Sequence, residues 1–190
     1  MDDKALVSEI IKGNQKAFRA LYDKYAQMVF TTAIGFVKDT GFAQDIMQEV
    51  FVDVLSSIKK FKGESKLSTW LYRIAINKSL NYLRDNRNYL TLIKSSTSND
   101  SYSVLTESRT EEQASPLKKI EHEEMAKVLH SAINNLPEKQ RIAFVLCKYN
   151  DMSYTEIAET MQLSVSSVES LLFRARKGLQ KSLVKFYKNI

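Results

Sequence analysis

Five side chains that can contact nucleic acid recur at helical spacing in the first half of the chain. They are Trp70, Arg73, Asn77, Asn81 and Arg84, separated by steps of 3, 4, 4 and 3 residues. Residues with this spacing lie on one face of an α-helix. Asparagine amides can read base edges, and arginine can bind phosphate or guanine. Trp70 either wedges against a base pair or fills the hydrophobic core, and the pattern leaves both roles open.

A lysine-rich loop, residues 59–66, precedes this helix. Its four lysines supply charge for phosphates, and Gly63, Glu64 and Ser65 form a turn that could fold over an unstacked base. Holding a base outside the duplex costs a few kcal/mol and needs a stacking surface and backbone contacts. The candidate nucleic-acid contacts in this half are Lys62, Ser65, Lys66, Trp70, Arg73, Asn77, Asn81, Arg84 and Arg87.

A second set of candidate contacts lies at the start of the last predicted helix. Serine and arginine can bind bases or phosphates, and a glutamate can accept a hydrogen bond from cytosine. Ser166 and Glu169 also fit an S-x-x-E capping box, so Glu169 either contacts DNA or caps the helix. The set is Ser166, Ser167, Glu169, Ser170, Phe173, Arg174 and Lys177.

An acidic stripe follows one face of the helix predicted over residues 43–58. It contains Asp45, Gln48, Glu49 and Asp53, with the apolar Val52 beside it. Such a stripe suits a basic helical partner, and an ordinary solvated face is the alternative. A catalytic carboxylate pair is excluded because no histidine lies nearby and a surface helix offers no dry pocket. We therefore predict no enzyme.

Positive charge is concentrated in two separate blocks. Residues 59–94 carry nine Lys/Arg and two Asp/Glu, a net charge of +7, and residues 171–190 carry six Lys/Arg and no acid, a net charge of +6. The whole chain has a net charge of +6. This distribution favours a polyanion bound at two places, and two solvated helix faces are the alternative.

Composition excludes several other classes of protein. The single Cys147 allows neither an intrachain disulfide nor a thiolate metal site. No stretch approaches the roughly 20 apolar residues needed to span a bilayer, and the acidic N-terminus does not resemble a signal peptide. His122 and His130 lack a glutamate three residues earlier, and both are expected to be exposed. We predict a soluble cytoplasmic protein without a metal or cofactor.

The elements that position these residues are predicted to be helices, since the chain has only five glycines and two prolines. Helices are expected over 3–12, 14–37 and 43–58, then from a cap at Ser68 or Thr69 to about Arg87. The polar, serine-rich and acidic stretch 88–116 is typical of a flexible linker.

Helical pattern resumes over 117–134 and 137–148. The motif "SYTE" at 153–156 predicts a capping box that opens a short helix ending at Met161. A turn, "QLS", and a long basic helix from about Val165 complete a helix-turn-helix. The fold class is therefore all-α, with helical domains at 1–90 and 117–190 joined by a linker at 91–116.

Four stretches resemble the extracytoplasmic-function (ECF) group of bacterial RNA polymerase sigma factors. They are "AQDIMQEVFVDVL" (43–55), "FKGESKLSTWLYRIAIN" (61–77), "KSLNYLRDNRN" (78–88) and "LPEKQRIAFVLCKYNDMSYTEIAETMQLSVSSVESLLFRARKGL" (136–179). The resemblance covers almost the whole chain. In the last stretch, Glu169 stands where many members of the family carry a basic residue, which puts the promoter sequence read there in doubt.

The resemblance implies a role for each set. The acidic stripe with Val52 would bind core RNA polymerase, the 62–87 set would bind and melt the −10 element, and the 166–177 set would bind the −35 element of promoter DNA. The linker would thread through the polymerase, and an anti-sigma factor would be a further partner. A stand-alone helix-turn-helix regulator is the alternative, although its N-terminal half would not need the basic block at 59–87.

Overall fold

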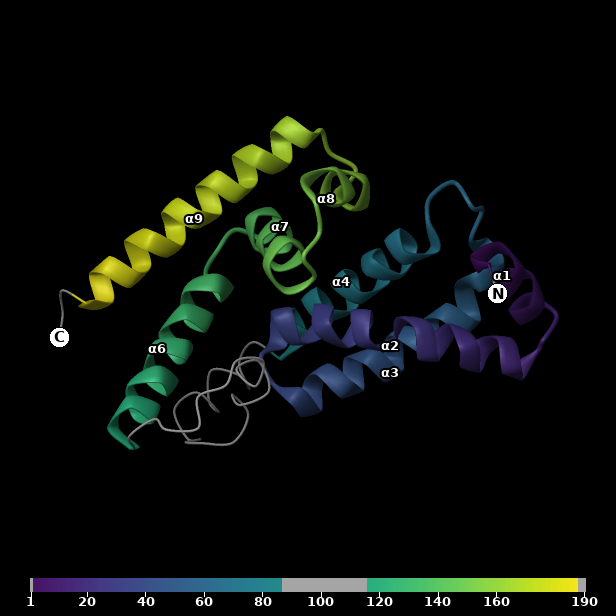
Figure 1. The fold of residues 1–190 in the computed structure, drawn as a ribbon, viewed down its shortest axis with the longest axis horizontal. Helices are drawn as coiled ribbons and strands as arrows, with labels where there is room; N and C mark the ends of the chain where they lie inside the picture. Colours follow the sequence, from purple (N-terminus) through teal and green to yellow (C-terminus); the bar gives the residue numbers. More distant parts are fainter. Residues whose placement is uncertain (1, 87–115, 188–190) are drawn as a thin grey trace.

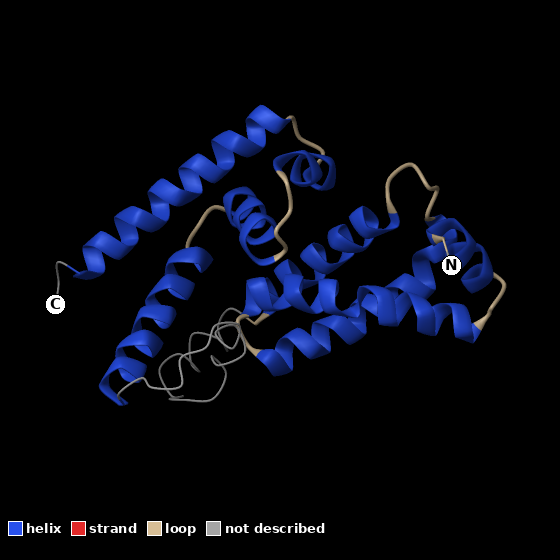
Figure 2. Ribbon diagram, viewed as in Figure 1, coloured by secondary structure: helices blue, strands red, loops and turns tan. Residues whose placement is uncertain are grey.

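The computed structural model describes residues 2–86 and 116–187, with side-chain detail for 2–86 and 125–184. Within these ranges every regular element is a helix (Figure 2). The predicted all-α class and the helix-turn-helix are confirmed. The predicted linker at 91–116 lies outside the described residues except for Pro116, where a helix begins.

The first half is a bundle in which three longer helices pack against one another. Its elements are α1 (Asp3–Ile11), α2 (Gln15–Val37), α3 (Thr40–Ser57), the 3-10 turn η1 (Ile58–Lys60) and α4 (Leu67–Asp85). Asn14 and Asp39 cap α2 and α3 by accepting backbone N–H groups of the first turn. The apolar stripes of α2, α3 and α4 meet at fully buried residues such as Leu21, Val50 and Leu71.

The predicted cap of α4 at Ser68 or Thr69 is wrong. The helix begins at Leu67, and Lys66 takes the cap position without a side-chain bond. Leu67 packs in the core, and the helix begins there without a capping side chain. Thr69 is thereby buried in the first turn, with its hydroxyl 3.5 Å from a carboxylate oxygen of Glu159 in the second half.

The second half contains α6 (Pro116–Asn134), α7 (Glu138–Tyr149), α8 (Tyr154–Met161) and α9 (Val165–Tyr187). The predicted capping box is present, because Ser153 accepts from the Glu156 amide at 3.3 Å and donates its own amide to the Glu156 carboxylate at 3.0 Å. Gln162 takes a left-handed conformation at φ 55° and ends α8. Figure 1 shows α8 beside the start of α9, and α6 lies along later turns of α9.

The two halves lie in contact. Helix α2 packs on α7 and helix α4 packs on α8 (Figure 1). One continuous apolar core therefore contains residues of both halves. The later turns of α6 and α9 enclose a smaller cluster around Ile133 and Leu179. The helix-turn-helix is therefore seated on the N-terminal bundle over the described part of the chain.

Candidate nucleic-acid interface and acidic ridge

Helix α3 presents the predicted acidic stripe to solvent. Asp45, Gln48 and Glu49 are exposed, Asp53 is partly exposed, and Val52 has 65% of its surface exposed. The opposite face is buried in the core. We name this surface the acidic ridge, and it consists of Asp45, Gln48, Glu49, Val52 and Asp53.

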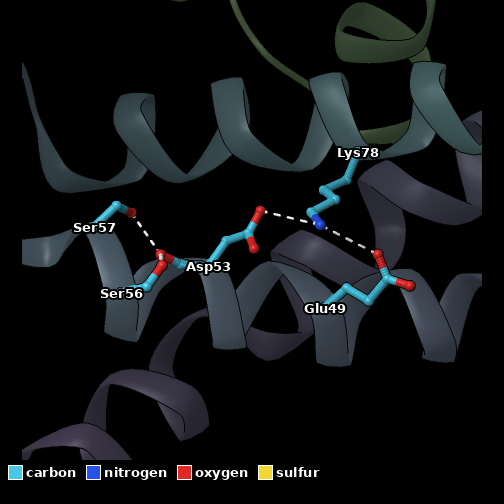
Figure 3. Close-up of polar contacts among 5 residues, drawn as sticks. All are labelled: Glu49, Asp53, Ser56, Ser57 and Lys78. Atoms are coloured by element: carbon cyan, nitrogen blue, oxygen red, sulfur yellow. Dashed lines mark hydrogen bonds and ion pairs between the residues drawn. The ribbon is translucent and has the colours of Figure 1, made fainter.

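Sequence reasoning missed two neighbours of the acidic ridge. The Lys78 ammonium on α4 lies 3.2 Å from Glu49 and 3.1 Å from Asp53 (Figure 3). The hydrogen bond to Asp53, followed by the one to Glu49, raises the pKa of Lys78. Leu55 is also exposed at the end of α3, although helical periodicity alone groups it with the core. The Lys78 contact depends on how α3 and α4 pack, which spacing within one helix does not reveal.

The lysine-rich loop before α4 is exposed. The side chains of Lys59, Lys60, Lys62 and Lys66 all face solvent, and Ser65 is partly exposed. Gly63 has φ +71°, a left-handed conformation that favours glycine and turns the loop back toward α4. The loop thus gathers four cationic groups beside the start of the helix.

The α4 face is only partly open. Asn77, Asn81 and Arg84 are exposed as predicted, while Arg87 lies outside the described residues. Trp70 is half-buried and packs on Phe61, with ring centroids 5.3 Å apart. Trp70 therefore packs against the core and Phe61 while part of its surface stays exposed.

Arg73 departs most from the expected open face. Its Nε donates to the carbonyl of Thr160 at 3.0 Å and its Nη2 donates to the carbonyl of Glu159 at 2.8 Å, both in α8. The sequence places Arg73 correctly on the α4 face. The sequence pattern does not indicate that the helix-turn-helix covers Arg73.

The start of α9 exposes a second polar face. Ser166, Glu169, Ser170, Arg174 and Lys177 are exposed, and Ser167 is partly exposed. Among them Phe173 has 57% of its surface exposed, and the Lys177 ammonium lies 4.6 Å from the centroid of its ring. All seven predicted residues of this set share one region of the helix.

The capping role considered for Ser166 and Glu169 is wrong. The Ser164 hydroxyl accepts the backbone N–H of Ser167 at 3.2 Å, and α9 begins at Val165. Because the helix starts earlier than that capping box requires, Ser166 already lies within its first turn. The exposed carboxylate of Glu169 therefore has no capping role to fill.

His130 is half-buried rather than exposed. Burial, together with the charge of Lys38, lowers its pKa to about 4. The side chain of His122 lies outside the described residues. Across the described ranges no group of three or more potential metal-ligating side chains comes together. None of the helices described there has the length and apolar character to cross a membrane.

Comparison with known proteins agrees with this geometry. Residues 21–89 match the family model for Sigma-70 region 2, and residues 126–179 match Sigma-70, region 4. The RNA polymerase sigma-H factor of Pseudomonas aeruginosa is 34% identical over 95% of this chain and 93% of its own length. The ECF RNA polymerase sigma-E factor of Escherichia coli K12 is 32% identical, covering 96% and 95%.

The chain belongs to the ECF family of RNA polymerase sigma factors. This family consists of transcription-initiation factors that direct RNA polymerase to promoters, not of catalytic enzymes. A solved structure of CnrH in complex with the cytosolic domain of CnrY is similar to this sigma factor, with a TM-score of 0.64 and 26% identity over 96% of this chain and 97% of that one.

The matched ranges place each candidate surface within this sigma factor. Region 2 includes the acidic ridge, the lysine-rich loop and the α4 face, and region 4 includes α7, α8 and the exposed start of α9. The stand-alone regulator is not favoured, because its N-terminal half would have no reason to match region 2.

Proposed function

We propose that this sigma factor binds core RNA polymerase through the acidic ridge and promoter DNA through the α4 face and the start of α9. One observation carries the proposal. Each matched region has a helix that leaves a large apolar side chain exposed among polar ones, Val52 on α3 and Phe173 on α9. An apolar side chain surrounded by polar groups can anchor an interface, and here each one lies in a region that the sigma-factor family models match.

The acidic ridge supplies charge and an apolar anchor for a basic helical partner. Its carboxylates would steer the encounter with a cationic coiled coil of the polymerase, and Val52 would be buried on docking. Lys78 holds Glu49 and Asp53 on one side of α3, so less side-chain freedom is lost when the partner binds.

Region 2 would bind the −10 element once its strands separate. The loop lysines and Arg84 would contact phosphates, while Asn77 and Asn81 present amides for base edges. Trp70, supported by Phe61, would stack against the last paired base. The set proposed for this element is Lys62, Ser65, Lys66, Trp70, Arg73, Asn77, Asn81, Arg84 and Arg87.

Region 4 would place α9 in the major groove at the −35 element. Ser166, Ser167 and Ser170 lie where the helix begins, and Arg174 and Lys177 continue one side. Glu169 would accept a hydrogen bond from a cytosine amine, and Phe173 would pack against a base or sugar. A domain division at 1–90, 91–116 and 117–190 would let the two regions contact both elements at once.

This sigma factor would work in the cytoplasm, without a metal or cofactor, and an anti-sigma factor would regulate it. The similar protein CnrH has been solved in complex with the cytosolic domain of a second protein, CnrY. A partner of that kind would compete with core polymerase for surfaces such as the acidic ridge.

Alanine substitution separates the DNA-binding and polymerase-binding roles. Asn77→Ala combined with Asn81→Ala should reduce promoter opening, measured with a fluorescent base in the −10 element, while leaving affinity for core polymerase unchanged. The matched control is Gln27→Ala, which removes an exposed side-chain amide whose hydrogen bond is to Thr31 on its own helix, α2. An equal loss of polymerase affinity in the double variant would show that this face is structural.

A further inference from the structure

Lys78 lies where the two candidate surfaces of region 2 meet. On α4 it directly follows Asn77 and precedes Asn81 by three positions, a spacing that makes Lys78 and Asn81 neighbours on the helix surface. Its ammonium nevertheless extends to α3, where it lies 3.2 Å from Glu49 and 3.1 Å from Asp53 (Figure 3). One cation is thus held by the acidic ridge while its helix position borders the α4 face.

These ion pairs can be exchanged for others. The side chain of Glu49 is 62% exposed and that of Asp53 is 43% exposed, so cationic groups of a partner can reach both carboxylates. Ion pairs between exposed side chains are weak, because water already solvates the separate charges. The hydrogen bond to Asp53 raises the pKa of Lys78, so Lys78 stays cationic at neutral pH.

The charge balance at this place does not favour DNA in the free protein. Glu49 and Asp53 carry two negative charges against the single positive charge of Lys78, and the surplus repels phosphates at the edge of the α4 face. A basic helix docked on the acidic ridge would neutralise both carboxylates. Lys78 would then lack a counter-ion, and a backbone phosphate of the promoter strand could take that place.

We propose that Lys78 is a further contact to the −10 strand, released to a DNA phosphate when core polymerase engages Glu49 and Asp53. The inference rests on the proposed roles of the acidic ridge and the α4 face. Lysine suits such an exchange, since its flexible four-carbon chain can redirect the ammonium without movement of either helix. Binding of polymerase and binding of DNA then strengthen each other, because each favours the same arrangement of Lys78.

The contact is tested in the holoenzyme. Lys78→Met removes the charge at similar length, and Lys78→Arg keeps a charge. Core polymerase is saturated with each full-length variant, and fluorescence anisotropy measures affinity for a fork DNA whose −10 strand is unpaired, taken from a promoter that the holoenzyme transcribes. A series of salt concentrations gives the slope of log affinity against log salt.

Loss of one phosphate contact should reduce that slope by about 0.7, which corresponds to about fivefold weaker affinity at about 0.1 M salt. We expect this change in Lys78→Met and a return toward wild type in Lys78→Arg. The control Lys16→Met, which removes an exposed cation on α2, should match wild type. An unchanged slope in Lys78→Met refutes the contact, since a purely structural role would not change the number of phosphates bound.

The exchange is tested in the free sigma factor. Glu49→Gln with Asp53→Asn releases Lys78 without polymerase, so affinity for a degenerate single-stranded DNA should rise by about threefold or more. Adding Lys78→Met should abolish the gain. The charge-matched control is Glu9→Gln with Asp23→Asn, since both carboxylates pair with cations three or four residues away. A gain no larger than the control's, or one that persists without Lys78, refutes the exchange. Circular dichroism checks folding.

The outcomes separate this inference from the proposed function. If Asn77→Ala with Asn81→Ala impairs promoter opening while Lys78→Met leaves DNA affinity and salt slope unchanged, the α4 face stands and Lys78 is not part of it. If Lys78→Met weakens only polymerase binding, Lys78 serves to order the acidic ridge and the DNA contact is refuted. If none of these variants changes DNA binding, the proposed role of the α4 face fails as well.

Discussion

The ammonium of Lys78 on α4 lies 3.1 Å from the carboxylate of Asp53 on α3. Both side chains are partly exposed, so this ion pair contributes at most about 1 kcal/mol to stability. Its main consequence is orientation, because the same ammonium also holds Glu49 at 3.2 Å. The acidic ridge is thereby ordered before any partner binds.

Neutralising these two carboxylates should weaken binding to core polymerase. Glu49→Gln with Asp53→Asn removes two charges at nearly constant shape, and we expect about a tenfold lower affinity at low salt. Because salt screens this attraction, the difference should shrink as ionic strength rises. Surface plasmon resonance with immobilised core polymerase measures both effects.

A control for this experiment is Asp23→Asn on α2, which removes an exposed carboxylate paired with Arg19 away from the ridge. It should leave affinity unchanged. An unchanged affinity in the Glu49/Asp53 variant would remove the electrostatic role of the ridge.

The cap of α9 gives a prediction on stability. Ser164→Ala should lower the free energy of unfolding by about 1 kcal/mol, since the Ser164 hydroxyl satisfies the amide of Ser167. Ser166→Ala, two residues later, should cost much less because Ser166 caps no amide at that helix start. Thermal unfolding followed by circular dichroism compares the two. A larger cost for Ser166→Ala would show that α9 begins later than Val165.

Glu169 should set one base of the −35 element. Replacing it with alanine removes the acceptor for a cytosine amine, so discrimination at that base pair should fall by about 1–3 kcal/mol. Selection from a randomised −35 library, transcribed by the reconstituted holoenzyme, measures base preference. Lys181→Ala, an exposed cation later on α9, should leave the preferences as they are. If Glu169→Ala changes all sequences equally, the residue carries no sequence information.

Buried Lys38 should make the packing of α7 on α2 depend on pH, because its ammonium lies 3.6 Å from the centroid of the Tyr149 ring on α7. Burial lowers its pKa to about 7 from an ordinary value of 10.5, and the Tyr149 ring offsets part of that cost. Separation of the regions would restore the higher pKa. The packed arrangement of the two regions then binds fewer protons than the separated one between about pH 7 and 10.5. Packing of the regions therefore strengthens as pH rises, by at most about tenfold per pH unit.

The groups around Lys38 do not produce this dependence. Burial raises the pKa of Tyr149 to about 12 and raises that of Tyr72 beside Asn150, while the pKa of His130 is lowered to about 4. Small-angle X-ray scattering at pH 7.5 and 9.5 should show a smaller radius of gyration at the higher pH in wild type. Lys38→Met should be insensitive, whereas Lys16→Met, an exposed lysine on α2, should behave as wild type. Equal compaction in Lys38→Met would assign the effect to another group.

Much of the fold follows from local pattern. The capping box at Ser153 and the apolar periodicity of α3 are interactions within about four residues, and both are present as predicted. The start of α4 differs from the prediction, because the helix begins at the buried Leu67 and no side chain caps it. No capping residue in the local sequence therefore marks the N-terminal boundary of α4.

The candidate surfaces could be predicted one helix at a time, but not in relation to one another. Helical spacing places Arg73 correctly on its face, since that depends only on the geometry of α4. The bonds from Arg73 to α8 join residues 86 and 87 positions apart, and Lys78 reaches Glu49 across 29 positions. Contacts between residues so far apart in the sequence depend on how the helices pack. The periodicity within one helix does not predict that packing.

The most direct test of the account is transcription by core RNA polymerase reconstituted with this sigma factor on fragmented genomic DNA. Sequencing of transcript 5′ ends should reveal start sites that require both components and share −10 and −35 elements upstream. The sigma factor should also co-purify with the core enzyme. Failure to associate with core polymerase, together with no sigma-dependent start sites, would contradict the account.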